Sequence, residues 1–220
     1  MTNKADVNEF KFKIDLKSRG FDGFDHETDF NHLRCILKTG FLASRNYVQS
    51  HFPELGDNAW KSVIDNTDEK VKQHVRFYFY KRTPTNYRFE QNNPEGMAYL
   101  VFDYDICHHE DAYFSNGNAA CHRSEFMKVS DYFESDGSFL DLNCIFDRTP
   151  MINNKEEIKR IRNSELLVKE PVYLKDMKKI VFKTEKAKNE FWSSIDDKEI
   201  TRNYKDRSVV DGSYFCQVRK

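Results

Sequence analysis

Residues 75 to 80 read Val-Arg-Phe-Tyr-Phe-Tyr, an alternating, aromatic and β-prone run that Pro84 interrupts shortly afterwards. Such a run is typical of a strand that packs at least one face into a core. The apolar run at 98–103 predicts a second buried strand. Phe and Tyr number 19 and 11, so a core can form although 32% of residues are charged. The chain is therefore expected to be globular. Further strands are expected at 165–168, 180–182 and 214–218.

Three segments have helical spacing. Phe30, Leu33, Ile36, Leu37 and Phe41 recur at three- and four-residue steps, and Gly40 supplies a stop signal. Helical patterns also cover 156–162 and 184–192. Strands and helices follow one another without regular alternation, and no Gly/Ser linker or repeat divides the chain. We predict one α+β domain over residues 1–220, rather than a doubly wound sheet.

Charge is balanced overall and uneven locally. The chain has 35 Lys plus Arg and 36 Asp plus Glu, which excludes a globally cationic DNA-coating protein. Residues 99–142 hold nine acids against Arg123 and Lys128, whereas residues 155–188 hold eleven Lys or Arg against six acids. The second stretch is where a polyanion would bind. Two solvated faces of opposite sign are the alternative.

Location and redox state follow from two observations. No apolar run approaches the roughly 20 residues of a membrane span, and the first residues contain no apolar signal segment. The five cysteines are scattered and never spaced C-x-x-C. We expect a cytoplasmic protein with reduced thiols.

Two weak patterns suggest metal chemistry. Cys107-His108-His109 and Cys121-His122 contain zinc-ligand types at spacings that match no common zinc site. Glu157-Ile-Lys159 is an E-x-K sequence of the kind found in nucleases, but it falls in a helical pattern, where the two side chains point apart. We therefore expect no metal.

Four ordered blocks are more specific. They are His26-Glu27-Thr28 with the helix end at 36–42, the segment 76–85, the segment 114–120, and Arg162-Asn163-Ser164-Glu165-Leu166-Leu167-Val168. In this order they resemble the DarT family of DNA ADP-ribosyltransferases, whose blocks read H-x-T with I-L-x-x-G-x-L, F-Y-F-x-x-R-[ST]-P, F-[ST]-[DN]-G-N-A and R-x-A-E-x-L-V. The resemblance implies an ADP-ribosyltransferase-type fold, with two facing sheets, flanking helices and a cleft for NAD.

The chain departs from the family pattern at three places. Ser164 stands where the family usually has Ala, and His32 falls where an Asn is expected. The family also uses an arginine upstream of the aromatic strand, and residues 60–74 contain none. Arg76 and Arg82 are the nearest candidates for that role.

The resemblance assigns Glu165 as the catalytic carboxylate, because cleavage of the nicotinamide–ribose bond develops positive charge on the sugar. A carboxylate can also accept the proton of an attacking base nitrogen. Arg82, the second catalytic candidate, could clamp the pyrophosphate. An ordinary exposed strand-end glutamate is the alternative for Glu165.

The remaining candidates contact NAD or DNA. His26 and Thr28 are two residues apart and so face the same way on an extended segment. NAD contacts are expected from these two residues and from His32, Tyr78 and Arg76. Substrate contacts are expected from Asn118 and Arg162. For His26 and Thr28 the alternative is a helix-entry turn. For Tyr78 it is packing in the core, and for Asn118 it is a simple turn.

The resemblance therefore implies an enzyme that ADP-ribosylates a base in single-stranded DNA. It would be the toxin of a bacterial toxin–antitoxin pair, opposed by an antitoxin that hydrolyses ADP-ribosyl-DNA. Thr85 stands where thymine-modifying relatives often carry Met, which favours guanine over thymine. A non-catalytic nucleic-acid-binding or antitoxin-like module, and a transferase acting on RNA or protein, remain alternatives.

Overall fold

The strands form a largely antiparallel sheet in the computed structural model, which describes residues 3–56, 65, 67–83, 87, 90–91, 95–147 and 155–215. The strand order is β10-β9-β4-β1-β3-β7-β5-β6, and β2 pairs separately with β8. The strands are β1 (Phe24–Asp29), β2 (Phe41–Leu42), β3 (His74–Tyr78), β4 (Met97–Phe102), β5 (Tyr113–Ser115), β6 (Phe126–Lys128), β7 (Glu165–Lys169), β8 (Val172–Tyr173), β9 (Met177–Phe182) and β10 (Ser208–Val210). β9 and β10 pair in parallel, whereas the other pairs are antiparallel.

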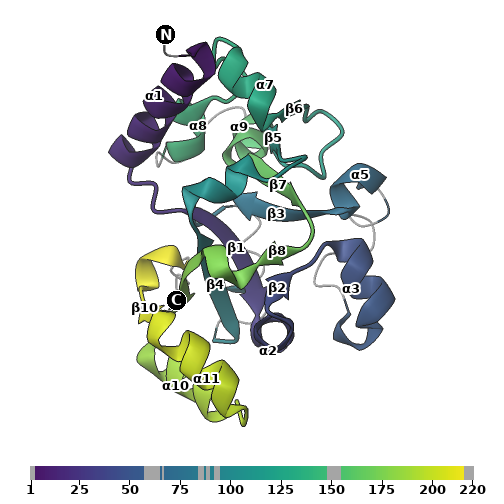
Figure 1. The fold of residues 1–220 in the computed structure, drawn as a ribbon, viewed down its shortest axis with the longest axis vertical. Coiled ribbons are helices and arrows are strands. Elements are labelled where there is room, and N and C mark those ends of the chain that lie inside the picture. The colour runs from purple at the N-terminus through teal and green to yellow at the C-terminus, as the bar shows by residue number, and fades with distance from the viewer. Residues whose placement is uncertain are drawn as a thin grey trace.

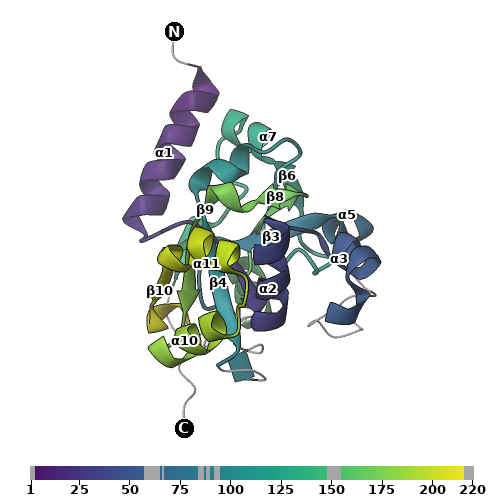
Figure 2. The same ribbon diagram turned by 60° about the horizontal axis from the view of Figure 1, so that its bottom comes forward.

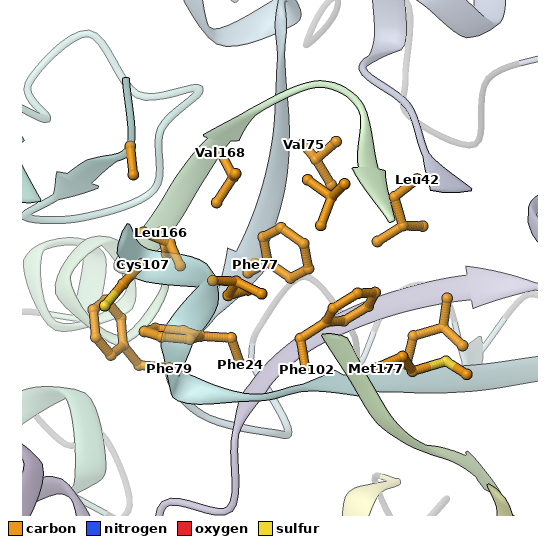
Figure 3. Packing of buried hydrophobic residues seen from close by; sticks show 14 of the residues in the cluster. Phe24, Leu42, Val75, Phe77, Phe79, Phe102, Cys107, Leu166, Val168 and Met177 are labelled. Carbon is orange, nitrogen blue, oxygen red and sulfur yellow. The ribbon is translucent and has the colours of Figure 1, made fainter. Parts of the chain in front are cut away.

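The long sheet is divided between β1 and β3. β1 pairs with β4 along its whole length but with β3 only through Asp25 and Tyr78. Apolar side chains of β3 and β7 face those of β1 and β4, and Figure 3 shows Phe77 above Phe102 between them. Their rings lie edge to face, with centroids 5.2 Å apart. The predicted α+β fold with two facing sheets is thus confirmed as two halves that share one core.

Helices cover the ends and one side of these halves. They are α1 (Lys4–Ser18), α2 (Phe30–Thr39), α3 (Arg45–His51), α5 (Glu69–Lys72), α7 (Val129–Glu134), α8 (Leu142–Phe146), α9 (Lys155–Arg162), α10 (Glu185–Ser193) and α11 (Lys198–Tyr204). Short 3₁₀ turns cover Pro53–Leu55, Tyr104–His108, Leu174–Asp176, Lys205–Arg207 and Gly212–Tyr214. α1 and α7 lie at one end and α10 and α11 at the other (Figure 1). Figure 2 shows α2 between α11 and α3.

The helix predicted from Phe30 is confirmed as α2. Asp29 caps its N-terminus, since the Asp29 carboxylate accepts the backbone N–H groups of Asn31 and His32. Gly40 ends it with φ 80°, the left-handed conformation that glycine adopts without strain. This cap places β1 directly before α2, so the polar residues of β1 lie at the entrance to the helix.

The other predicted elements are largely confirmed. The strands at 75–80, 98–103, 165–168 and 180–182 correspond to β3, β4, β7 and β9, and the helices at 156–162 and 184–192 correspond to α9 and α10. Pro84 lies outside the described residues.

The closing strand expected at 214–218 is wrong for its described part. Gly212–Tyr214 is a 3₁₀ turn, started by Asp211, whose carboxylate accepts the N–H of Ser213. Tyr214 and Phe215 then pack on the ring of Tyr99, with centroids 5.6 and 5.0 Å away. The terminal strand of the sheet is β10 instead. Among the described residues, no helix is long and apolar enough to cross a membrane.

Candidate active site

Glu165 is fully buried and bound by a guanidinium. Arg76 donates from Nε to Oε2 of Glu165 at 2.5 Å and from Nη2 to Oε1 at 2.7 Å. The Glu165 side chain is 0% exposed and that of Arg76 23%. Burial alone would lower the pKa of Arg76, but the charge of Glu165 outweighs this and raises it. Glu165 is therefore no ordinary surface glutamate.

The approach to Glu165 is fixed by a tight turn at the end of α9. The hydroxyl of Ser164 donates to the carbonyl of Ile161 at 2.7 Å, and the side chain of Asn163 donates to the carbonyl of Lys159 at 2.6 Å. Both side chains are buried. Ser164 therefore fits a place where the family has Ala, because its buried hydroxyl has a partner.

The loop after β5 completes the surroundings of Glu165. The backbone N–H of Ala119 donates to Oε1 of Glu165 at 2.9 Å, and the N–H of Glu165 donates to the hydroxyl of Ser115 at 3.1 Å. Oδ1 of Asn118 accepts from Nη2 of Arg76 at 3.3 Å and from the N–H of Ala120 at 2.9 Å. The structure thus brings the predicted residues Glu165, Arg76 and Asn118 together.

Arg160 holds this loop from α9. Its Nη1 donates to the backbone carbonyl and the side-chain oxygen of Asn116, at 3.0 and 3.1 Å, and its own carbonyl accepts the N–H of Asn118 at 2.8 Å. Gly117 leaves the space that the guanidinium occupies, since a Cβ there would lie 2.4 Å from Nη1 of Arg160. The position of the Ala119 N–H therefore depends on a close approach between Gly117 and Arg160.

His26 lies on β1 beside this group. Its Nδ1 is 3.0 Å from the carbonyl oxygen of Arg76. Burial lowers the pKa of His26 to about 4, so the imidazole is neutral at pH 7. A carbonyl only accepts, so Nδ1 carries the proton and Nε2 is left as an acceptor. His26 can therefore accept a hydrogen bond from a hydroxyl or an amide.

A cavity of about 230 Å³ lies along β1, α2 and α3. His26, Thr28 and His32 all line it, as expected for three side chains that contact one ligand. The ring of His32 is fixed by Asp29, whose Oδ2 lies 2.7 Å from Nδ1 of His32. Thr28 is extended in β1 and directly precedes Asp29, the N-cap of α2.

Two charged residues of the cavity wall were not among the site residues expected from the sequence. Glu27 and Arg45 both line the cavity. Glu27 stands inside the quoted His-Glu-Thr block, but alternation alone placed it on the opposite face from His26 and Thr28. Arg45 follows Ser44, the N-cap of α3. The signal in the sequence for Arg45 was a basic side chain at the start of a helix, shortly after the first block of the family pattern.

The groups with possible metal ligands are not assembled. His108 pairs with Glu9 at 3.1 Å, and Cys107 is buried. Glu157 pairs with Arg160 and Lys159 pairs with Glu156, so the two charged side chains of the E-x-K sequence bind different partners. Over the described ranges, no group of three or more His, Cys, Asp or Glu could hold a metal ion. The E-x-K sequence therefore forms no nuclease-like site.

Residues 26–215 match the family model described as "DarT: ssDNA thymidine ADP-ribosyltransferase". The chain belongs to the DarT family. The resemblance seen in the four blocks is thereby confirmed. The DarT chain described here is a single-stranded-DNA ADP-ribosyltransferase, and NAD is the donor that this class of enzyme uses. No curated protein sequence gives a match.

Solved DarT structures share the fold at low sequence identity. The structure of Thermus sp. 2.9 DarT with ADP-ribosylated single-stranded DNA has a TM-score of 0.68 and 15% identity, covering 88% of this chain and 95% of that one. The same protein with NAD+ has a TM-score of 0.62 and 15% identity over 88% and 96%. Thermosipho africanus DarTG with ADP-ribose has a TM-score of 0.68 and 16% identity over 89% and 51%.

Three predicted DarT site residues lie differently from the others. Tyr78 stands directly opposite Glu165 in the sheet and is buried. Arg82 is exposed in the loop after β3, with φ 67°, and is not among the residues that line the cavity. Arg162 ends α9 and donates from Nη2 to Asp147 at 3.0 Å. The structure thus joins Tyr78 to the Glu165 group, whereas Arg82 lies exposed in the loop after β3 and Arg162 pairs with Asp147.

Proposed function

We propose that this DarT protein transfers ADP-ribose from NAD to a base of single-stranded DNA, with Glu165 as the central carboxylate. The observation that supports this most is a fully buried carboxylate held by Arg76 and by the Ala119 N–H. Such a group is preorganised, so it needs no rearrangement when positive charge develops nearby. The cavity lined by His26, Thr28 and His32 is the proposed place for the dinucleotide.

The chemistry requires one carboxylate and one leaving group. The bond between the nicotinamide nitrogen and ribose C1′ breaks, and nicotinamide leaves with the bonding electrons. Glu165 stabilises the positive charge that develops on the sugar. A nitrogen of the DNA base then forms a bond to C1′, and the proton of that nitrogen passes to the Glu165 carboxylate. Arg76 keeps Glu165 oriented through two hydrogen bonds.

The side chains around the cavity suit a dinucleotide. Nε2 of His26 and the hydroxyl of Thr28 are suited to ribose hydroxyls or to the carboxamide. Arg45 is a cation in the cavity wall, and we assign it the pyrophosphate contact that the sequence suggested for Arg82. Tyr78, His32 and Asn118 complete the proposed NAD and substrate contacts, and Arg162 is proposed only for DNA.

The target base is a separate proposal. The description of the family names thymidine, whereas Thr85 favours guanine. Thr85 lies outside the described residues, so the preference for guanine stays a prediction. Oligonucleotides with a single thymine or a single guanine in an otherwise inert sequence distinguish the two.

The biological role proposed is that of a toxin in the cytoplasm of a bacterium. One similar structure is of a DarTG protein with ADP-ribose, which supports pairing with an antitoxin. The partner would be a hydrolase that removes ADP-ribose from DNA. Expression of the wild-type chain is then expected to arrest growth, and co-expression of such a hydrolase is expected to restore it.

Labelled NAD incubated separately with single-stranded DNA, RNA and protein tests the proposal. Label on DNA alone is expected. Label on RNA or protein alone would favour a transferase of the same fold with another acceptor. NAD consumption and labelling that are both at background would favour a non-catalytic nucleic-acid-binding module.

A further inference from the structure

Glu27 is a half-buried acid in the middle of β1, and the proposed chemistry gives it no role. Its Oε2 is buried and has no hydrogen-bond partner among the described residues. A buried polar atom without a partner destabilises a fold unless a ligand or water satisfies it. Because Glu27 also lines the cavity, a bound ligand can reach it.

The groups around Glu27 come from several elements. Its carboxyl is affected by Glu90, by Arg76 of β3 and by Glu165 of β7. Tyr99 stands opposite Glu27 on β4, and the Tyr99 hydroxyl donates to Glu90 at 3.3 Å. Burial, then the neighbouring carboxylate of Glu90, raises the pKa of Glu27 to about 8. The carboxyl therefore carries a proton near pH 7.

We propose that the protonated carboxyl of Glu27 donates a hydrogen bond to an oxygen on the nicotinamide–riboside half of NAD. The inference rests on the proposed function, since it assumes that NAD occupies the cavity. Glu27 is then a binding residue that positions the donor for the chemistry at Glu165.

Two observations point to this half of the dinucleotide. Glu27 lines the cavity together with His26 and Thr28, and its carboxyl is also close enough to Glu165 and Arg76 to be affected by their charges. The reacting ribose carbon must lie between the cavity and Glu165. The nicotinamide carbonyl and the ribose hydroxyls adjoin that carbon, and both can accept from a neutral carboxyl.

A neutral donor also suits the charges already present. Glu165 supplies the negative charge that stabilises the developing cation. An ionised Glu27 would be a third carboxylate beside those of Glu90 and Glu165 and would add like-charge repulsion. Protonation of Glu27 avoids this repulsion and supplies a donor.

The test compares Glu27→Met, which removes the polar group at similar length, with Glu27→Gln, which keeps a neutral donor. Binding of NAD and of ADP-ribose is measured by calorimetry at pH 7, after thermal melts establish that both variants fold. Glu27→Met is expected to weaken NAD binding about 3- to 10-fold, the cost of one hydrogen bond. Glu27→Gln is expected to stay within about twofold of wild type.

The ADP-ribose arm identifies the oxygen. Weaker binding of NAD with unchanged binding of ADP-ribose assigns the nicotinamide carbonyl, and weaker binding of both assigns a ribose hydroxyl. Either result supports the proposal.

The pH arm separates this role from simple packing. NAD affinity of the wild type should fall between pH 7 and 9, as Glu27 loses its proton. The Gln variant should be flat over that range, because it has no proton to lose. His26, already neutral at pH 7, adds no titration there.

Three results would overturn the proposal. They are wild-type affinity of Glu27→Met for NAD, equal damage in the Gln and Met variants, and an alkaline fall that persists in Glu27→Gln. A wild-type protein that binds no NAD would instead contradict the proposed function and this inference together.

Discussion

Arg76 and Glu165 form a two-point ion pair across adjacent strands, with the carboxylate fully buried and the arginine side chain partly exposed. The two residues are 89 positions apart in the sequence. The register of β3 against β7 pairs Tyr78 with Glu165 and Arg76 with Leu167, so Arg76 reaches Glu165 diagonally. This geometry orients the proposed catalytic carboxylate.

Glu165→Gln is expected to reduce ADP-ribose transfer by about two to four orders of magnitude while NAD binding persists. Gln keeps the volume and a polar partner for Arg76. Glu165→Ala would leave the Arg76 cation without its carboxylate, and loss of one partner of a buried pair costs about 3–5 kcal/mol at full burial, less here because Arg76 is 23% exposed. Transfer rates and thermal melts measure both effects.

Glu156→Ala is the matched control for Glu165, since the Glu156 side chain is 79% exposed on α9 and pairs with Lys159. Near-wild-type transfer is expected. Glu170 is a poor control, because its carboxylate accepts the backbone N–H of Ser44 at 2.6 Å, next to the cavity. Full activity in Glu165→Gln would show that the catalytic carboxylate has been misplaced.

Arg45→Ala is expected to raise the KM for NAD about 10- to 100-fold, because a charge-assisted hydrogen bond to a pyrophosphate contributes about 1.5–3 kcal/mol. Arg82→Ala is the comparison, and its KM should change less because Arg82 does not line the cavity. Steady-state kinetics with varied NAD decide between them. A larger rise in KM for Arg82→Ala than for Arg45→Ala would assign the pyrophosphate contact to Arg82.

Gly117→Ala is expected to slow transfer about 10- to 100-fold, since the added Cβ displaces Arg160 and with it the loop that carries the Ala119 N–H. Gly212→Ala is the matched control, because the nearest atom to its added Cβ is 3.8 Å away. Transfer rates are compared at saturating NAD. Equal rates for the two variants would mean that the loop does not set the position of Glu165.

Stability is expected to fall as pH rises from about 5 to 8, in part through Glu27. The pKa of its carboxyl is raised from 4.5 to about 8 in the folded protein. Between these two pKa values the folded state binds more protons than the unfolded state. The contribution of Glu27 to stability is therefore complete below the unfolded pKa of 4.5 and is lost as the pH rises to the folded pKa of about 8. Thermal melts of Glu27→Gln should show a shallower decline than the wild type. If the wild type and Glu27→Gln lost stability equally with rising pH, the raised pKa of Glu27 would be contradicted.

Single-strand DNA binding is expected to weaken steeply with salt, as phosphates are neutralised by basic side chains. The stretch 155–188 is divided by the fold, since α9 leads into Glu165 and α10 lies at the opposite end of the molecule (Figure 1). Lys159→Ala should lower the log–log salt slope by about one, and Lys186→Ala should leave it unchanged. Binding titrations at several salt concentrations measure the slope, and a salt-independent affinity would exclude an electrostatic groove.

Local patterns in the sequence determined most elements and led to Glu165 as the proposed catalytic carboxylate. The period of Phe30, Leu33 and Leu37 with the stop at Gly40 defines α2, because helix periodicity and caps act within a few residues. The aromatic run at 75–80 likewise defines β3, although the strand ends at Tyr78. The ordered blocks indicated the family of the chain and the candidate carboxylate Glu165, since short motifs can be recognised where the rest of the sequence differs.

The tertiary structure alone decided which residues act on one another. The pairing of Arg76 with Glu165 depends on strand register across 89 positions, and no local pattern encodes it. The same is true of Glu27 and Arg45, which come from β1 and α3 and line one cavity. Burial also reversed the simplest reading of Glu165 as a surface residue. Solvent exposure and charge environment are set by contacts between distant segments, and these exist only once the chain has folded.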